Sequence, residues 1–108
     1  MRWRRRPAAD IPRAGMERLV RTAVDGPGRL DPGIRRAAFT ASAIEDSAAA
    51  SYVDKVVHHA YRVTDADVEA LLRSGWSEAQ VLELTIAAAL GAGQRRLDAG
   101  LAALGGER

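Results

Sequence analysis

The two histidines of the chain, His58 and His59, stand side by side in the segment KVVHHAYRV. Imidazole is the side chain that most readily exchanges protons near neutral pH. Asp54 precedes His58 by four residues and Ser51 precedes it by seven, so a helix would align the three in one polar column. A carboxylate so placed can hold one imidazole tautomer and raise its basicity. The spacing predicts a candidate acid–base site of Ser51, Asp54 and His58.

Each of these residues also has a plainer interpretation. An Asp–His pair four residues apart can be an exposed pair with no chemical role. Glu45 could supply a second carboxylate, or it could favour the start of the helix electrostatically. His59 falls beside Tyr52 on the helical wheel, so we expect it to cover the edge of the core. His58 is therefore the histidine whose neighbours could support acid–base chemistry.

Composition excludes several kinds of site. The 108 residues include no cysteine, so disulfides, thiolate metal sites and cysteine nucleophiles are absent. Two histidines alone cannot complete a structural zinc site without carboxylates. The GAG segment at Gly91 follows no strand, which argues against a dinucleotide-binding loop. We expect no metal and no cofactor.

The elements that position these residues are expected to be helical. Hydrophobic residues make up 47 % of the chain and aromatic residues only 5 %, a balance that favours closely packed helices over a sheet. Turn and capping signals divide residues 11–108, taken as a single domain, into about five helices. The fold class is therefore all-α and compact. The expected helices cover residues 15–24, 32–44, 48–62, 65–74 and 78–104.

The helix starts carry clear local signals. Asp31 precedes a proline at the first helical position. Capping boxes are expected where Thr64 is followed by Asp67 and where Ser77 is followed by Gln80. Gly75 stands between these two helices, where a left-handed C-terminal cap belongs.

The last helix is expected to be long. Gly91 and Gly93 each disfavour a helix by about 1 kcal/mol relative to alanine. The leucines nevertheless stay in phase with Ile86 and Gly93 on one face; they are Leu90, Leu97, Leu101 and Leu104. We expect one helix whose glycines let another helix approach closely. Part of its apolar face is expected to contact another subunit.

The net charge of +2 arises in a short N-terminal segment. Residues 1–10 carry four arginines and one aspartate, and the rest of the chain is close to neutral. We expect a flexible basic tail there, able to contact nucleic acid only weakly. A helix-turn-helix around Gly75 is disfavoured because Glu78 and Glu83 would face the phosphates. No run suits a membrane span or a secretion signal, so we expect a soluble, cytoplasmic protein.

Residues 52–101, YVDKVVHHAYRVTDADVEALLRSGWSEAQVLELTIAAALGAGQRRLDAGL, suggest a family. This segment resembles the carboxymuconolactone decarboxylase and alkylhydroperoxidase D-like superfamily. The most specific part is VTDADVEALLRSGWSEAQVLEL, which leads into a long alanine-rich helix. The resemblance implies an all-helical subunit that assembles into a homo-oligomer, a trimer or a hexamer, through the C-terminal helix.

The family's peroxidase chemistry uses two cysteines in a C-x-x-C motif, a histidine four residues later and an upstream glutamate. One alignment puts Ser51 and Asp54 at the cysteines, His58 at the histidine and Glu45 at the upstream acid. A second alignment rests on more residues and matches the segment after Val63 to the part that follows the catalytic motif. The histidines then match nothing catalytic. Cysteine-dependent peroxidase activity is excluded in both alignments.

Three functions follow as expectations, and whether the protein is an enzyme is left open. The first is a noncatalytic or accessory oligomeric helical protein. The alternative is an acid–base enzyme for a small carboxylate or lactone, in which His58 moves the proton, Asp54 orients it and arginines hold the anionic ligand. The third is weak nucleic-acid binding by the arginine-rich tail.

Overall fold

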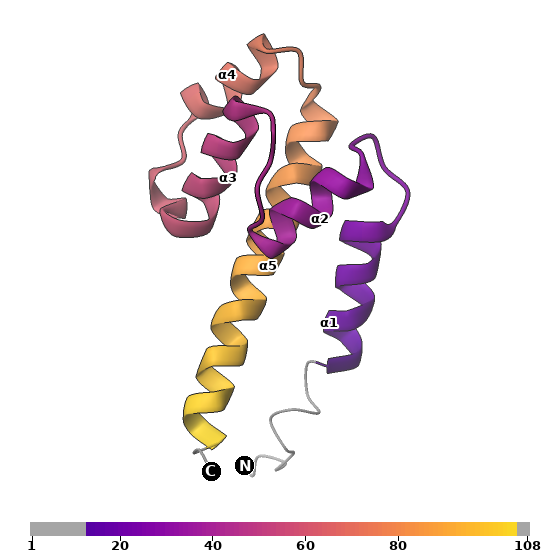
Figure 1. Ribbon diagram of the computed structural model, residues 1–108, viewed down its shortest axis with the longest axis vertical. Coiled ribbons are helices and arrows are strands. Elements are labelled where there is room, and N and C mark those ends of the chain that lie inside the picture. Colours follow the sequence, from indigo (N-terminus) through magenta and orange to yellow (C-terminus); the bar gives the residue numbers. More distant parts are fainter. Residues whose placement is uncertain (1–12, 106–108) are drawn as a thin grey trace, which may run out of the picture.

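The computed structural model describes residues 13–105, and the regular structure in this range is entirely helical (Figure 1). The all-α class and the long last helix are confirmed. The basic tail expected at residues 1–10 lies outside the described residues. The helices are α1 (Arg13–Val20), the π-helical turn η1 (Arg21–Asp25), α2 (Pro32–Thr40), α3 (Ser47–His58), the 3₁₀ turn η2 (Ala60–Arg62), α4 (Asp65–Arg73) and α5 (Glu78–Gly105).

The predicted helix caps are present. Asp31 accepts a hydrogen bond from the backbone N–H of Gly33 at 3.0 Å. Ser77 and Gln80 exchange two reciprocal bonds of 3.0 and 3.1 Å at the start of α5. Gly75 has a φ of 102°, in the left-handed region that ends α4. These caps use residues within three positions of one another, and they were predictable for that reason.

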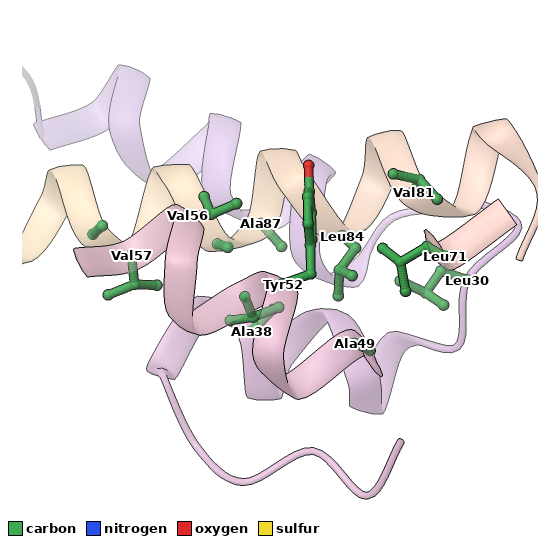
Figure 2. Close-up of a cluster of buried hydrophobic side chains, with 13 residues drawn as sticks. Leu30, Ala38, Ala49, Tyr52, Val56, Val57, Leu71, Val81, Leu84 and Ala87 are labelled. Atoms are coloured by element: carbon green, nitrogen blue, oxygen red, sulfur yellow. The ribbon is translucent and has the colours of Figure 1, made fainter. Parts of the chain in front are cut away.

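The core forms where α2, α3 and α4 pack against the first half of α5 (Figures 1 and 2). Leu84 and Ala88 of α5 are completely buried there. Burying an aliphatic side chain such as Leu84 stabilises the fold by roughly 1.5–3 kcal/mol. The buried cluster consists of Leu30, Ala38, Ala49, Tyr52, Val53, Val56, Val57, Leu71, Val81, Leu84, Ala87, Ala88 and Ala92.

The helices α2 and α5 approach closely at Gly91. A Cβ atom at Gly91 would lie 1.9 Å from the carbonyl oxygen of Phe39, at the end of α2. The expected role of a glycine in close helix packing is therefore confirmed for Gly91. Arg95 donates to the same Phe39 carbonyl at 2.6 Å, and Arg96 donates to the Val57 carbonyl at 2.9 Å. Two cations of α5 thus stabilise the C-terminal ends of α2 and α3.

Two helices end earlier than expected. α2 stops at Thr40 because Ala41 takes a left-handed conformation with a φ of 57°, and Ser42 bonds back to the Ala37 carbonyl at 2.8 Å. Ala41 is consequently exposed.

α3 stops at His58 because His59 leaves the helical region, with φ −143° and ψ 52°. His59 is exposed, as is Ala60 after it, so the prediction that His59 covers the edge of the core is wrong. Tyr52 fills this part of the core instead, and its hydroxyl lies 2.7 Å from that of Thr85.

The first helix changes character along its length. Residues 15–24 were expected to be one α-helix, but the α-helix ends at Val20 and a π-helical turn follows. Val24, in that turn, is completely buried, while Leu19 is half exposed. An inserted π-helical turn shifts the phase of the helix face, which the sequence pattern does not signal.

The last turns of α5 extend beyond the core. At 1.5 Å per residue, the 28 residues of α5 measure about 42 Å. Figure 1 shows its C-terminal part continuing past α2 and α3. From Arg95 to Gly105 the side chains are exposed, apart from a partly buried Leu101. None of the helices in the described range is long and apolar enough to cross a membrane.

Candidate functional site

Asp54 and His58 lie one turn apart on α3, as their spacing predicted. The distance from His58 Nε2 to Asp54 Oδ1 is 3.7 Å, and the two side chains are 62 % and 71 % exposed. A separation of 3.7 Å is longer than a hydrogen bond, and solvent screens a pair this exposed. The pair is therefore present but only loosely coupled.

Both residues line a small cleft between α3 and the segment that follows α2. The cleft has a volume of about 130 Å³. Ala41, Ser42 and Ile44 form its opposite wall. Since a water molecule occupies about 30 Å³ of liquid, a cleft of this size holds only a small molecule. The cleft combines an apolar lining with one carboxylate and one imidazole at its edge.

Ser51 and Glu45 do not join this pair. Both side chains are exposed, and neither lines the cleft. Within residues 13–105, no hydrogen bond or ion pair connects either of them to Asp54 or His58. The predicted column of Ser51, Asp54 and His58 thus reduces to its last two members.

A different acidic residue caps α3. Asp46, and not Glu45, accepts a hydrogen bond from the Ala49 N–H at 3.0 Å. The indole N–H of Trp76 donates to its other oxygen at 3.3 Å. The Ala49 hydrogen bond lowers the pKa of Asp46 against the opposing effect of burial, and Trp76 adds to the lowering. Asp46 therefore remains ionised as a structural cap and is not available as a proton donor near neutral pH.

On the neighbouring turn, Lys55 connects α3 to α4. Its ammonium group lies 2.9 Å from Asp67 Oδ1 and 3.1 Å from Oδ2. Asp67 also accepts the Thr64 N–H at 2.8 Å, which is one half of the predicted capping box. Lys55 lowers the pKa of Asp67 most, followed by the Thr64 N–H. This cation is thus already paired and cannot serve a ligand in the Asp54–His58 cleft.

The sequence pattern did not predict that Ser42 would line the same cleft as the pair. Ser42 lines the cleft, and its Oγ lies 2.6 Å from the Thr40 hydroxyl. No spacing rule could find Ser42, because its place depends on α2 ending at the left-handed Ala41. In the described part of the chain, no three His, Asp or Glu side chains lie close enough to hold a metal ion.

A second candidate site is the outward face of α5. Leu82, Ile86, Leu97 and Leu104 are 59 %, 41 %, 36 % and 83 % exposed. At 100° per residue, they fall within about 60° of one another, opposite the buried face. With the small residues between them they form what we call the outward stripe. The outward stripe consists of Leu82, Ile86, Ala89, Gly93, Leu97, Gly100 and Leu104.

The glycines of the outward stripe have open space where a side chain would begin, as far as the described residues go. A Cβ atom at Gly93 or at Gly100 would meet nothing within 4 Å among the described residues. Gly91, two positions from Gly93, is in contrast required by the approach of α2. The two glycines of the GAG segment thus have different environments.

Comparison of the chain with known proteins finds no matching family model, no matching curated protein and no matching solved structure.

Proposed function

We propose that this protein is a noncatalytic helical subunit that associates with a second copy of itself through the outward stripe of α5. The observation that carries the proposal is the exposure of four large aliphatic side chains along one line, opposite the core. Contiguous exposed apolar surface is uncommon on monomeric proteins and is typical of contact sites. Its removal from water would drive association.

The outward stripe is complementary to itself. If two copies of α5 run antiparallel about a two-fold axis at Gly93, Leu82 meets Leu104 of the second copy. Ile86 then meets Gly100, and Ala89 meets Leu97. Each large side chain in the middle of the stripe thus faces a small one, which is the arrangement that lets helix surfaces interdigitate. Such a contact is isologous, because each copy uses the same surface.

Gly93 would be the point of closest approach. A glycine inside a helix destabilises that helix by about 1 kcal/mol relative to alanine. Gly91 has a compensating contact with α2, whereas Gly93 has none within the described chain. A second α5 passing over Gly93 would supply that compensation, since the missing Cβ lets two backbones approach.

The family resemblance supports the same proposal. An all-α subunit with a long last helix agrees with the carboxymuconolactone decarboxylase-like class, whose members assemble through helix packing. Because the chain has no cysteine, we propose an accessory member without the redox chemistry. Of the trimer and hexamer that the resemblance implies, the hexamer with two-fold axes contains a contact of the proposed kind.

Light scattering and analytical ultracentrifugation over a range of protein concentrations test the proposal. We expect the wild-type protein to associate and Leu97→Glu to weaken association at least tenfold. Gly93→Ala should have two opposite effects, a more stable monomer and a weaker oligomer. Ala102→Glu is the matched control, because Ala102 is exposed on the same part of α5 but on the opposite side. A monomer at every concentration, or equal effects of Leu97→Glu and Ala102→Glu, would refute the proposal.

The Asp54–His58 cleft supports a second candidate, acid–base chemistry on a small carboxylate or lactone. His58 would move the proton and Asp54 would orient the ring. Among the described residues no arginine lines this cleft, so the expected anion-binding role of arginines gains no support there. The size of the cleft limits the ligand to a few heavy atoms.

The test is a titration with acetate and with γ-butyrolactone, followed through the imidazole NMR signals. We expect the His58 signals to shift and those of His59 to stay, and we expect Asp54→Asn to reduce the shift of the His58 signals. Equal shifts of both histidines would indicate a bulk effect of the additive and would remove the support for this candidate.

A further inference from the structure

Another cleft lies between α1, η1, α2 and the middle of α5, away from the Asp54–His58 cleft. Its volume is about 430 Å³. We propose that this cleft binds a small zwitterion with an apolar side chain, that is, a hydrophobic α-amino acid. The proposal is independent of self-association and rests on the groups that line the cleft.

The apolar part of the lining comes from Val20 and Phe39. Both side chains are partly buried, and both border the cleft. The backbone of Phe39 is fixed against α5, because its carbonyl accepts the Arg95 hydrogen bond and lies against Gly91. A volume of 430 Å³ falls within the range of small-molecule pockets, which combine an apolar lining with few polar groups.

Two unpaired charges of opposite sign border the same cleft. Glu17 and Arg21 both line it, yet no ion pair or hydrogen bond engages either side chain within residues 13–105. The other charged residues of the lining, Asp25 and Arg36, form an ion pair with each other. The cleft thus offers one free carboxylate and one free guanidinium. A ligand that carries both an ammonium and a carboxylate group complements this arrangement.

The side chain of Gln94 is a second, independent indication that a ligand binds in this cleft. This residue of α5 also lines the cleft, and its Oε1 is buried without a hydrogen-bond donor. A buried acceptor that lacks a donor destabilises the structure. The terminal torsion of a glutamine side chain is soft, so the amide can turn its oxygen toward a ligand. A ligand ammonium group would be the donor that both Gln94 and Glu17 lack.

The same groups argue against simpler ligands. A fatty acid would satisfy Arg21 but would be repelled by Glu17. An inorganic phosphate would leave Val20 and Phe39 uncovered and would meet the same repulsion. An apolar amine would leave the Arg21 guanidinium unpaired. Only a ligand with both charges and an apolar body uses all five groups.

Titrations of the full-length protein with four probes test the ligand class. The probes are L-leucine, leucinamide without the carboxylate, 4-methylpentanoate without the ammonium, and inorganic phosphate, all at constant ionic strength. Binding is followed by calorimetry and by backbone amide NMR. We expect L-leucine to bind at least about tenfold more tightly than the other three, because each omitted charge loses a charge-assisted hydrogen bond. Equal binding of 4-methylpentanoate and leucine, or no binding of leucine, would overturn the proposal.

Variants test the assigned residues. Arg21→Gln and Glu17→Gln should each weaken leucine binding about tenfold. Arg18→Gln is the matched control, since Arg18 is a neighbouring arginine that does not line this cleft; it lines an adjoining one, which shares Arg21 and Asp25 with it. Gln94→Met should raise the melting temperature of the ligand-free protein and at the same time weaken leucine binding. A loss of binding with Arg18→Gln equal to that with Arg21→Gln would contradict the assignment.

The two proposals can fail separately. Leu97→Glu, which disrupts the outward stripe, should leave leucine binding unchanged. If Leu97→Glu abolished leucine binding, the ligand site would depend on association, and the independent site proposed here would be wrong.

Discussion

The carbonyl oxygen of Phe39 lies where a side chain on Gly91 would begin. A Cβ atom at position 91 would be 1.9 Å from that oxygen, far inside van der Waals contact. α2 and α5 therefore meet backbone to backbone, without side chains between them. Arg95 strengthens the contact by donating to the same oxygen at 2.6 Å.

Gly91→Ala should destabilise the fold. A methyl group at this contact forces α2 away from α5, and overpacking of this kind costs about 1–3 kcal/mol or more. Gly100→Ala, on the same helix but with open space around it in the described chain, should stabilise the monomer by up to about 1 kcal/mol through helix propensity. Urea unfolding measures the change in stability of both variants. Equal unfolding midpoints for the two variants would show that α2 does not contact α5 at Gly91.

Arg35 should be far more important for stability than its neighbour Arg36. Arg35 is 2 % exposed, and its guanidinium group donates to the carbonyls of Leu30, Gly26 and Ala23 at 3.2, 2.7 and 3.2 Å. Arg35→Met would leave buried carbonyls without donors, with an expected loss of roughly 3 kcal/mol in the free energy of unfolding.

The control for this prediction is Arg36→Met. Arg36 is exposed and paired with Asp25, so its replacement should change stability by no more than about 1 kcal/mol. Thermal unfolding measures both variants. Similar losses for Arg35→Met and Arg36→Met would contradict the role given to the buried guanidinium group.

The Tyr52→Phe substitution should remove one hydrogen bond from the core. Thr85 Oγ1 donates to the Val81 carbonyl at 2.7 Å, so the Tyr52 hydroxyl acts as the donor in its 2.7 Å contact with Thr85. We expect a loss of about 1 kcal/mol for Tyr52→Phe. A double-mutant cycle with Thr85→Val isolates the pair, and additive effects of the two substitutions would show that the hydroxyls do not interact.

Glu83 should make the free energy of unfolding depend on pH. Its carboxylate accepts the N–H of Leu30 at 2.8 Å and the N–H of Arg29 at 2.9 Å. Burial raises the pKa of Glu83, but these hydrogen bonds and the charges of Arg35 and Arg29 outweigh it, so the pKa is lowered. A lowered pKa in the folded state means that the stabilisation is complete above the unfolded pKa, about 4.3, and is lost as the pH falls through the folded value.

Glu83→Gln should therefore unfold more readily than the wild type near pH 7, and the difference should shrink as the pH falls below about 4. Denaturant unfolding between pH 3 and 7 measures this difference. The exposed Glu69, which pairs only loosely with Arg73 at 4.0 Å, provides the control variant Glu69→Gln. A difference between Glu83→Gln and wild type that stays constant over this pH range would contradict the assignment.

Local signals predicted the parts of the fold that depend on neighbours in sequence. The capping box of Ser77 and Gln80 and the left-handed Gly75 involve residues within a few positions. The ends of α2 and α3 were missed because Ala41 and Ala60 are good helix formers by propensity. Residues 41 and 59 leave the α-helical conformation, and no residue type in either segment signals it.

Of the candidate site, the sequence predicted the proximity of Asp54 and His58 but not the cleft beside them. That cleft needs the loop after α2 to lie against α3. The burial of Arg35 was missed for a related reason, since its acceptors are backbone carbonyls and have no sequence signature. The cleft lined by Glu17, Arg21 and Gln94 likewise depends on how α1 and η1 are placed relative to α2 and α5.

The left-handed Ala41 gives the Asp54–His58 cleft a rigid wall. This conformation disfavours alanine by about 1–2 kcal/mol, so the rest of the fold must impose it. The bond from Ser42 to the Ala37 carbonyl helps to hold the turn. A wall fixed in this way is preorganised, and a ligand would not lose affinity by ordering it. The cleft would accordingly select ligands by how well they fit its existing shape, and its wall would change little on binding.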